Sequence, residues 1–134
     1  MRECRRGEPM KSHKDLDVWR LAVDLACEVY KTTGTFPKEE QYGMVNQMRR
    51  AATSIASNIA EGAARQSSKE FVQFLHIALG STSELDTQLE IATRVNLANP
   101  GELQKLQESA ARVNQMLRGL VKSVRGKALK AVNT

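Results

Sequence analysis

The chain has 134 residues, of which 41% are hydrophobic, 26% are charged and only 4% are aromatic. This length fits one domain whose hydrophobic core needs no disulfide or metal to hold it together. The aliphatic composition and the 3 prolines favour helices over a β-sandwich or barrel. No run of about 18 apolar residues is present, which excludes a membrane-spanning helix.

The net charge of +5 is concentrated at the two ends of the chain. Residues 1–14 carry five Lys or Arg against two acids, residues 112–134 carry six against none, and the segment between them is net negative. Basic ends attract nucleic acid or an acidic protein, and they also serve simply to keep a protein in solution. The basic N-terminal residues precede no apolar stretch, so we expect no secretory signal and a cytoplasmic location.

Two helices are predicted in the first half of the chain. The first begins near Asp15 or Asp17, ends at Gly34, and carries apolar residues at helical spacing. Pro37 suits the first position of a second helix, which runs to about Ala64. The apolar face of the first helix comprises Trp19, Ala22, Val23, Ala26, Val29 and Tyr30; the apolar face of the second comprises Val45, Met48, Ala52, Ile55, Ile59 and Gly62.

Two further helices follow. Ser67 opens the third as the N-cap of a capping box. We expect Gly80 to mark a close backbone contact, because glycine inside a helix otherwise costs about 1 kcal/mol. Asn99 and Pro100 open the fourth helix, which we expect to fray after Gly126. The apolar face of the third helix comprises Phe71, Phe74, Leu75, Ala78, Leu85, Leu89 and Ala92; that of the fourth comprises Leu103, Leu106, Ala110, Val113, Leu117, Leu120 and Val124.

The connections between these helices are only a few residues long, which makes neighbouring helices antiparallel. The sequence therefore predicts an all-α fold, an antiparallel up-and-down four-helix bundle over residues 15–125 whose helices cross at about 20°. Residues 1–14 and 126–134 are expected to be basic tails on either side of it.

A second, polar face accompanies the apolar face of the predicted second helix. A turn centred near residues 65–66 would place Arg50 opposite Ser81 and within one turn of Glu84, where an ion pair fits. Polar pairs of this kind fix register more than they add stability. The alternative is a solvated face with incidental periodicity. The predicted polar stripe, at an interface between helices or subunits, comprises Gln47, Arg50, Ser54, Asn58, Glu61, Ser81 and Glu84.

Several short motifs carry a family resemblance: LDVW at residues 16–19, FPKEE at 36–40, QMRRAA at 47–52 and SIASNIAEG at 54–62. In these motifs the chain resembles the bacterial four-helix bundle proteins, also called 23S ribosomal RNA intervening-sequence or S23 proteins. The resemblance covers about residues 15–125. One departure is Ala56, where the family usually has a proline.

The resemblance implies a left-handed bundle assembled as a ring-shaped homopentamer, and it brings no enzymatic activity. The family is also similar to accessory proteins of diversity-generating retroelements, which bind nucleic acid and a reverse transcriptase. We therefore expect a non-enzymatic oligomer that binds RNA or other nucleic acid electrostatically. The predicted nucleic-acid-binding residues are Arg49, Arg112, Arg118, Lys122, Arg125, Lys127 and Lys130. Two alternatives stay open: a scaffold that docks a partner enzyme or ribosomal component, and a passenger protein without a host function.

The residues that carry most enzyme chemistry are not clustered in this sequence. His13 and His76 have no potential metal ligands at helical spacing, so we expect no metal and no cofactor. Ser54 has no histidine nearby in sequence to activate it, and no phosphate-binding glycine loop is present. Cys27 is expected to be a buried structural thiol.

Overall fold

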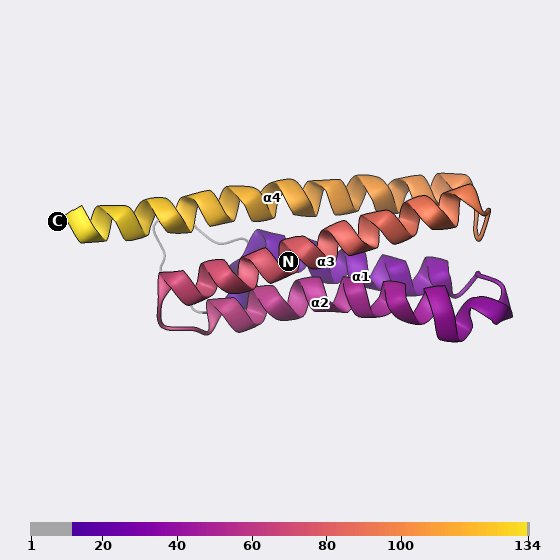
Figure 1. Cartoon of the computed structure of the whole chain (residues 1–134), viewed down its shortest axis with the longest axis horizontal. Helices are drawn as coiled ribbons and strands as arrows, with labels where there is room; N and C mark the ends of the chain where they lie inside the picture. Colours follow the sequence, from indigo (N-terminus) through magenta and orange to yellow (C-terminus); the bar gives the residue numbers. More distant parts are fainter. Residues whose placement is uncertain (1–11, 134) are drawn as a thin grey trace.

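The computed structural model describes residues 12–133; the side chains of residue 15 and of residues 129–133 lie outside the description, as do residues 1–11 and 134. Within this part of the chain the long elements are α1 (Asp17–Thr33), α2 (Asn46–Ala63), α3 (Ser68–Arg94) and α4 (Pro100–Asn133), and no strand occurs. Successive helices run in opposite directions (Figure 1), and α1 and α3 each pack against both α2 and α4. The predicted all-α four-helix bundle is confirmed.

Short irregular turns lead into α1 and α2. A 3-10 turn, η1 (His13–Asp15), precedes α1; a second 3-10 turn, η2 (Lys38–Glu40), and a π-helical turn, η3 (Gln41–Val45), precede α2. The predicted second helix therefore begins with two irregular turns, and Pro37 precedes them in an extended conformation. None of the helices in the described residues is both long and apolar enough to cross a membrane.

Side-chain caps open α3 and α4 as predicted. The Oγ of Ser67 accepts a hydrogen bond of 3.1 Å from the backbone N–H of Glu70. The Oδ1 of Asn99 accepts from the backbone N–H groups of Gly101 at 2.8 Å and Glu102 at 3.3 Å. These caps satisfy donors that the first turn of a helix leaves unpaired.

The C-terminal ends of the helices differ more from expectation. Asn96 ends α3 in the left-handed conformation, with φ 58°, and the N–H of Leu97 reaches back to the carbonyl of Ala92 at 3.0 Å, as in a Schellman motif. The expected fraying after Gly126 is wrong for the backbone, because α4 continues as a helix to Asn133. Its C-terminal end extends past the start of α3 (Figure 1).

The core is aliphatic, and α2 contributes to it as predicted, with every residue of its apolar face buried. The expected face of α1 is partly wrong. Val18 and Leu25 are buried, whereas Tyr30 is 49% exposed. Because α2 and α4 cover α1 from two sides, its buried arc is displaced from the one that the spacing predicts. Cys27 is an exposed free thiol, so its expected burial is also wrong.

The close backbone contact occurs at Gly62 and not at Gly80. A Cβ on Gly62 would lie 2.7 Å from the Cβ of Phe74 and 3.0 Å from Cδ1 of Phe71, whereas a Cβ on Gly80 would meet nothing within 4 Å. Gly62 therefore lets the last turn of α2 approach the first turns of α3. Gly80 lies on the exposed side of α3, so its expected packing role is wrong.

The register between α2 and α3 differs from the predicted one by a helical turn. The hydroxyls of Ser54 and Ser81 lie 2.8 Å apart, so Ser81 faces Ser54 and not Arg50. Helical side chains point toward the N-terminus of their own helix. In this antiparallel pair, side chains of α2 therefore tilt away from the connecting turn and those of α3 tilt toward it. As a result, the α2 partner of each α3 residue lies closer to the turn than backbone pairing alone predicts.

We expect Gly62→Ala to destabilise the bundle by about 1–3 kcal/mol, because the new methyl group overpacks the contact with the two phenylalanines. Gly80→Ala is the matched control, and we expect it to stabilise the protein by up to about 1 kcal/mol through helix propensity alone. Urea denaturation of both variants and the wild type measures these differences. Equal stability of the Gly62 variant and the wild type would contradict the packing role.

Candidate nucleic-acid and subunit interfaces

Exposed cationic side chains line the second half of α4. Val113, Leu117 and Val121 bury one face of this helix, which leaves the intervening positions on the surface. Arg112, Arg118, Lys122, Arg125 and Lys127 are all exposed there, and the segment from residue 112 onward contains no acidic residue. The side chain of Lys130, the last predicted member of this set, lies outside the described residues.

Three of these cations share one face of α4. At about 100° per residue, Arg118, Lys122 and Arg125 fall within roughly 60° of one another around the helix. Arg112 is about a third of a turn away and Lys127 is nearly opposite, so the structure separates these two from the others.

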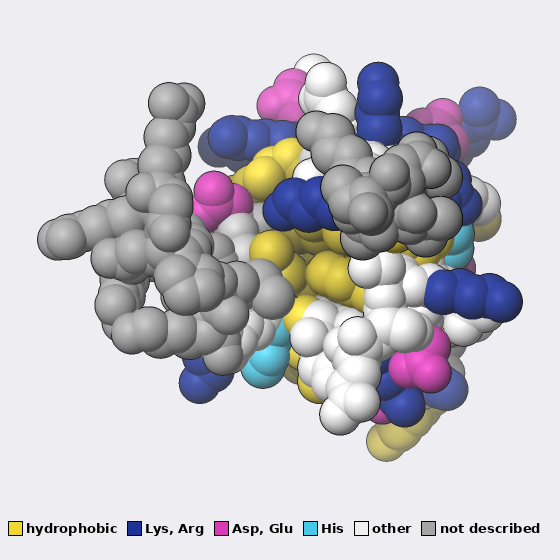
Figure 2. Space-filling view, turned by 90° about the vertical axis from the view of Figure 1, so that its left-hand side faces the viewer, with side chains coloured by type: hydrophobic (Ala, Val, Ile, Leu, Met, Phe, Trp, Pro, Cys, Tyr) yellow, Lys and Arg dark blue, Asp and Glu magenta, His cyan; other side chains and the backbone are white. Residues whose placement is uncertain are grey.

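A surface depression of about 450 Å³ lies between α3 and α4 at this cationic face, and we call it the α3–α4 groove. Its apolar members, Leu79 and Val121, are buried, and its polar members are all basic or histidine. Figure 2 looks onto this end of the molecule, where Lys and Arg side chains lie among acidic, histidine and uncharged ones around a hydrophobic centre. The groove is lined by His76, Leu79, Arg118, Val121, Lys122, Arg125 and Gly126.

Hydrogen bonds hold two of the groove cations in place. Nε of Arg118 donates to Oδ1 of Asn114, one turn earlier on α4, at 2.9 Å. Nη2 of Arg125 lies 3.1 Å from Nε2 of His76 on α3. Sequence reasoning missed His76 because its partner is 49 residues away in the chain.

Arg49 is not part of this cationic surface. Its Nε donates to Oγ1 of Thr33 at 3.0 Å, its Nη2 donates to the carbonyl of Tyr30 at 3.2 Å, and its guanidinium carbon lies 4.5 Å from the centre of the Tyr30 ring. The side chain therefore ties α2 to the last turn of α1, where a cation also suits the helix dipole. Its contact with nucleic acid stays a prediction.

The polar stripe forms a hydrogen-bonded centre between α2 and α3. The Ser54 hydroxyl that faces Ser81 also lies 3.0 Å from Nδ2 of Asn58, which donates at 2.8 Å to the Ser54 carbonyl as well. All three side chains are partly buried. Glu61 instead pairs with Arg65 on the exposed side of α2 at 3.0 Å.

The expected ion pair between Arg50 and Glu84 is wrong: among the described residues, no ion pair joins them. Both are exposed, and the register shift places Ser54, not Arg50, at the contact with Ser81. Glu84 instead accepts a 3.4 Å hydrogen bond from Nε2 of Gln88. A depression of about 420 Å³ is lined by Gln47, Arg50, Ala51, Ser54 and Glu84.

An apolar set beside the polar stripe was missed in the sequence. Ile77, Ile91 and Val95 of α3 are 51%, 44% and 57% exposed. Together with Ser81, Glu84 and Gln88 they recur at alternating intervals of four and three residues, so they share one face of the helix. That spacing was visible in the sequence, but the predicted apolar face of this helix included only the residues expected to point to the core.

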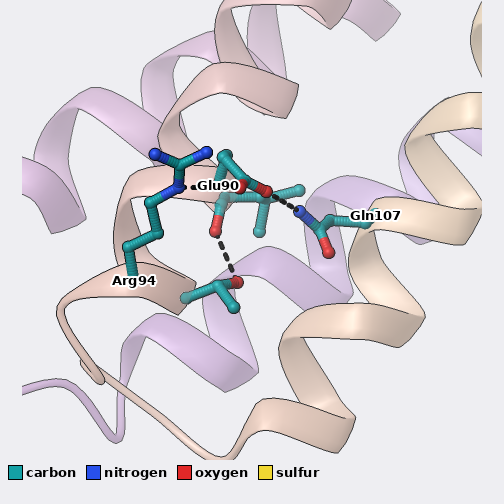
Figure 3. Close-up of polar contacts among 5 residues, drawn as sticks. Glu90, Arg94 and Gln107 are labelled. Carbon is teal, nitrogen blue, oxygen red and sulfur yellow. Dashed lines mark hydrogen bonds and ion pairs between the residues drawn. The ribbon is translucent and has the colours of Figure 1, made fainter.

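A polar cluster joins α3 to α4 at the other end of the helix pair. Glu90 accepts hydrogen bonds from Nε of Arg94 at 2.9 Å and from Nε2 of Gln107 at 3.2 Å (Figure 3). The Arg94 hydrogen bond first, and the Gln107 bond second, hold the pKa of the Glu90 carboxyl below its ordinary value. Its stabilising contribution is therefore present at neutral pH and is lost as the pH falls through the lowered pKa.

These features define a class of protein: a helical bundle with a cationic groove at one end and a polar, partly apolar face across α2 and α3. Residues 14–119 match the family model of the 23S rRNA-intervening sequence proteins, and the chain belongs to that family. Lys122 and Arg125 come after the matched region.

A solved structure of similar fold supports this assignment. It is the crystal structure of a protein of unknown function from the S23 ribosomal protein family of Bacteroides thetaiotaomicron VPI-5482. The two chains are 25% identical with a TM-score of 0.71, over 78% of this chain and 98% of that one. No curated protein matches. The descriptions of the family and of the solved structure name no catalytic activity.

We expect Arg49→Ala to destabilise the protein by about 1–2 kcal/mol, because two hydrogen bonds and a cation–π interaction with α1 disappear together. Arg49→Lys should recover little of this, since an ammonium cannot reproduce the planar fork. Arg112→Ala, at an exposed position on α4, should change the stability by less than about 0.5 kcal/mol. Thermal or urea denaturation compares the three variants. Similar losses of stability in Arg49→Ala and Arg112→Ala would count against a stabilising contact between Arg49 and α1.

Proposed function

We propose that this protein binds nucleic acid, RNA in the first place, through the α3–α4 groove. The observation that supports this best is the convergence of Arg118, Lys122 and Arg125 on one groove whose described lining includes no acidic side chain. The choice of RNA rests on the family description, which refers to 23S rRNA.

The spacing of the groove cations suits a phosphate backbone. Arg118 and Arg125 are seven residues apart on α4, which is about 10 Å along a helix. That distance spans neighbouring phosphates of one strand, and the cations contact phosphates without reading bases. Few aromatic side chains are available for stacking, so binding should depend on salt and little on sequence.

Replacing all three groove cations, as Arg118→Ala, Lys122→Ala and Arg125→Ala together, should weaken RNA binding by about tenfold or more. The slope of log affinity against log salt should fall by about 0.7 for each phosphate of a single strand that the variant no longer neutralises. Fluorescence anisotropy with a labelled single-stranded RNA at several salt concentrations measures both quantities.

The matched control removes the same charge from the far part of the bundle, as Lys31→Ala, Lys38→Ala and Lys105→Ala. These lysines are exposed and lie outside the groove. If the two triple variants bind RNA equally well, the groove is not the binding site.

We further propose that the protein self-associates through the face of α2 and α3 that carries the polar stripe. Arg50 and Glu84 line one depression there, and a second depression, lined partly by Tyr30 and Thr53, adjoins it at Arg50 and Ser54. Ile77, Ile91 and Val95, spread along the same face of α3, add the hydrophobic contact that stable interfaces need. A ring of five subunits is what the family resemblance implies.

Arg50→Glu should dissociate the assembly, because it places a second acid in the depression that holds Glu84 and like charges at an interface are repulsive. Sedimentation velocity measures the mass of the wild type and the variant. Arg112→Glu reverses the same charge on α4 and should leave the mass unchanged. A wild type that stays monomeric at about 100 μM would refute self-association, because a typical specific complex has a Kd below that concentration.

The alternative function is a scaffold whose basic groove binds an acidic protein. The same triple groove variant distinguishes the two functions. The scaffold is favoured by two results together. The substitutions leave the RNA affinity unchanged, and the variant loses an acidic protein that copurifies with the wild type from its native host.

A further inference from the structure

His76 extends from α3 to the rim of the α3–α4 groove, where its Nε2 lies 3.1 Å from Nη2 of Arg125. A guanidinium has donors but no acceptor, so Arg125 donates and His76 accepts. In this arrangement Nε2 carries no hydrogen. His76 thus holds Arg125 against α3.

We propose that His76 is a phosphate contact of the α3–α4 groove and that its protonation strengthens the binding of nucleic acid. This inference rests on the proposed function of the groove. It adds one contact residue and a dependence of binding on pH.

The charged groups that line the groove with His76 are all basic. From α4, Arg118, Lys122 and Arg125 line the same groove; on α3, Gln73 and Gly80 are the neighbours one turn away on either side. Lys69 lies two turns earlier on the same face of α3, and Glu70, the nearest acid in that helix, is about a third of a turn around it.

Protonating Nε2 by itself removes the hydrogen bond from Arg125 and adds a fourth positive charge to three others. A phosphodiester reverses both effects. Its oxygens accept from the new Nε2–H and from the released Arg125 guanidinium, and its negative charge offsets the added positive one. Proton binding and phosphate binding therefore favour each other, and by linkage each increases the affinity for the other.

Histidine is the side chain that ordinarily changes charge between about pH 5 and pH 8. The phosphodiester and the uracil base stay in one ionisation state across that interval, so oligouridylate is the appropriate probe. We expect the full chain to bind it roughly three- to fivefold more tightly near pH 6 than near pH 8, the size of one exposed ion pair. Calorimetry in two buffers of different ionisation enthalpy should show net proton uptake on binding near neutral pH.

His76→Gln should bind with the same affinity at both pH values and take up no net proton on binding, whereas His76→Lys should bind tightly at both pH values. His13→Gln is the matched control, because the His13 ring packs against Trp19, 4.9 Å between centroids, outside the groove, and it should keep the full pH dependence.

Equal affinity of the wild type at both pH values, or an undiminished pH dependence in His76→Gln, overturns the role of His76. If the role of His76 is overturned but the wild type binds oligouridylate and the triple groove variant does not, the proposed function of the groove still stands. If the wild type binds no oligonucleotide at either pH, the proposed function fails together with this inference.

Discussion

The packing of α2 against α3 is the constraint on which the rest of the molecule depends. Gly62 leaves no room for a side chain beneath Phe71 and Phe74, and the Ser54 and Ser81 hydroxyls meet two turns further along. An apolar contact allows several registers, but a close backbone approach combined with a hydrogen bond between partly buried groups allows one. These two contacts fix where every residue of α3 lies relative to α2.

The position of α3 then decides both candidate surfaces. On one side, Glu84 is placed beside Arg50 and Ala51 in a shared depression, so the polar face is assembled from two helices. On the other side, α3 presents His76 to the basic half of α4, while Glu90 and Gln107 join the same helices at their other end. A slip of one turn between α2 and α3 would alter the polar face and move His76 along the bundle.

Local signals in the sequence predicted local structure well. Ser67 and Asn99 cap the helices that they were expected to cap, and the buried face of α2 is the predicted one, because cap bonding and helical spacing act within a few residues. The errors fall where a distant element decides the outcome. Tyr30 is exposed because α2 and α4 cover other positions of α1, and Gly80 has open space because the close approach occurs at Gly62.

The sequence by itself determined the helix class, most helix limits, the family motifs and the concentration of positive charge after residue 112, since all of these are properties of short segments. Helical spacing alone separates Arg112 and Lys127 from Arg118, Lys122 and Arg125, and only the tertiary structure decided which other groups these cations lie beside. It placed Arg118, Lys122 and Arg125 at one groove, engaged Arg49 with α1, and brought in His76 from another helix. The physical reason is that a groove needs two elements in a fixed register, and side chains from both must tilt and pack before that register is set.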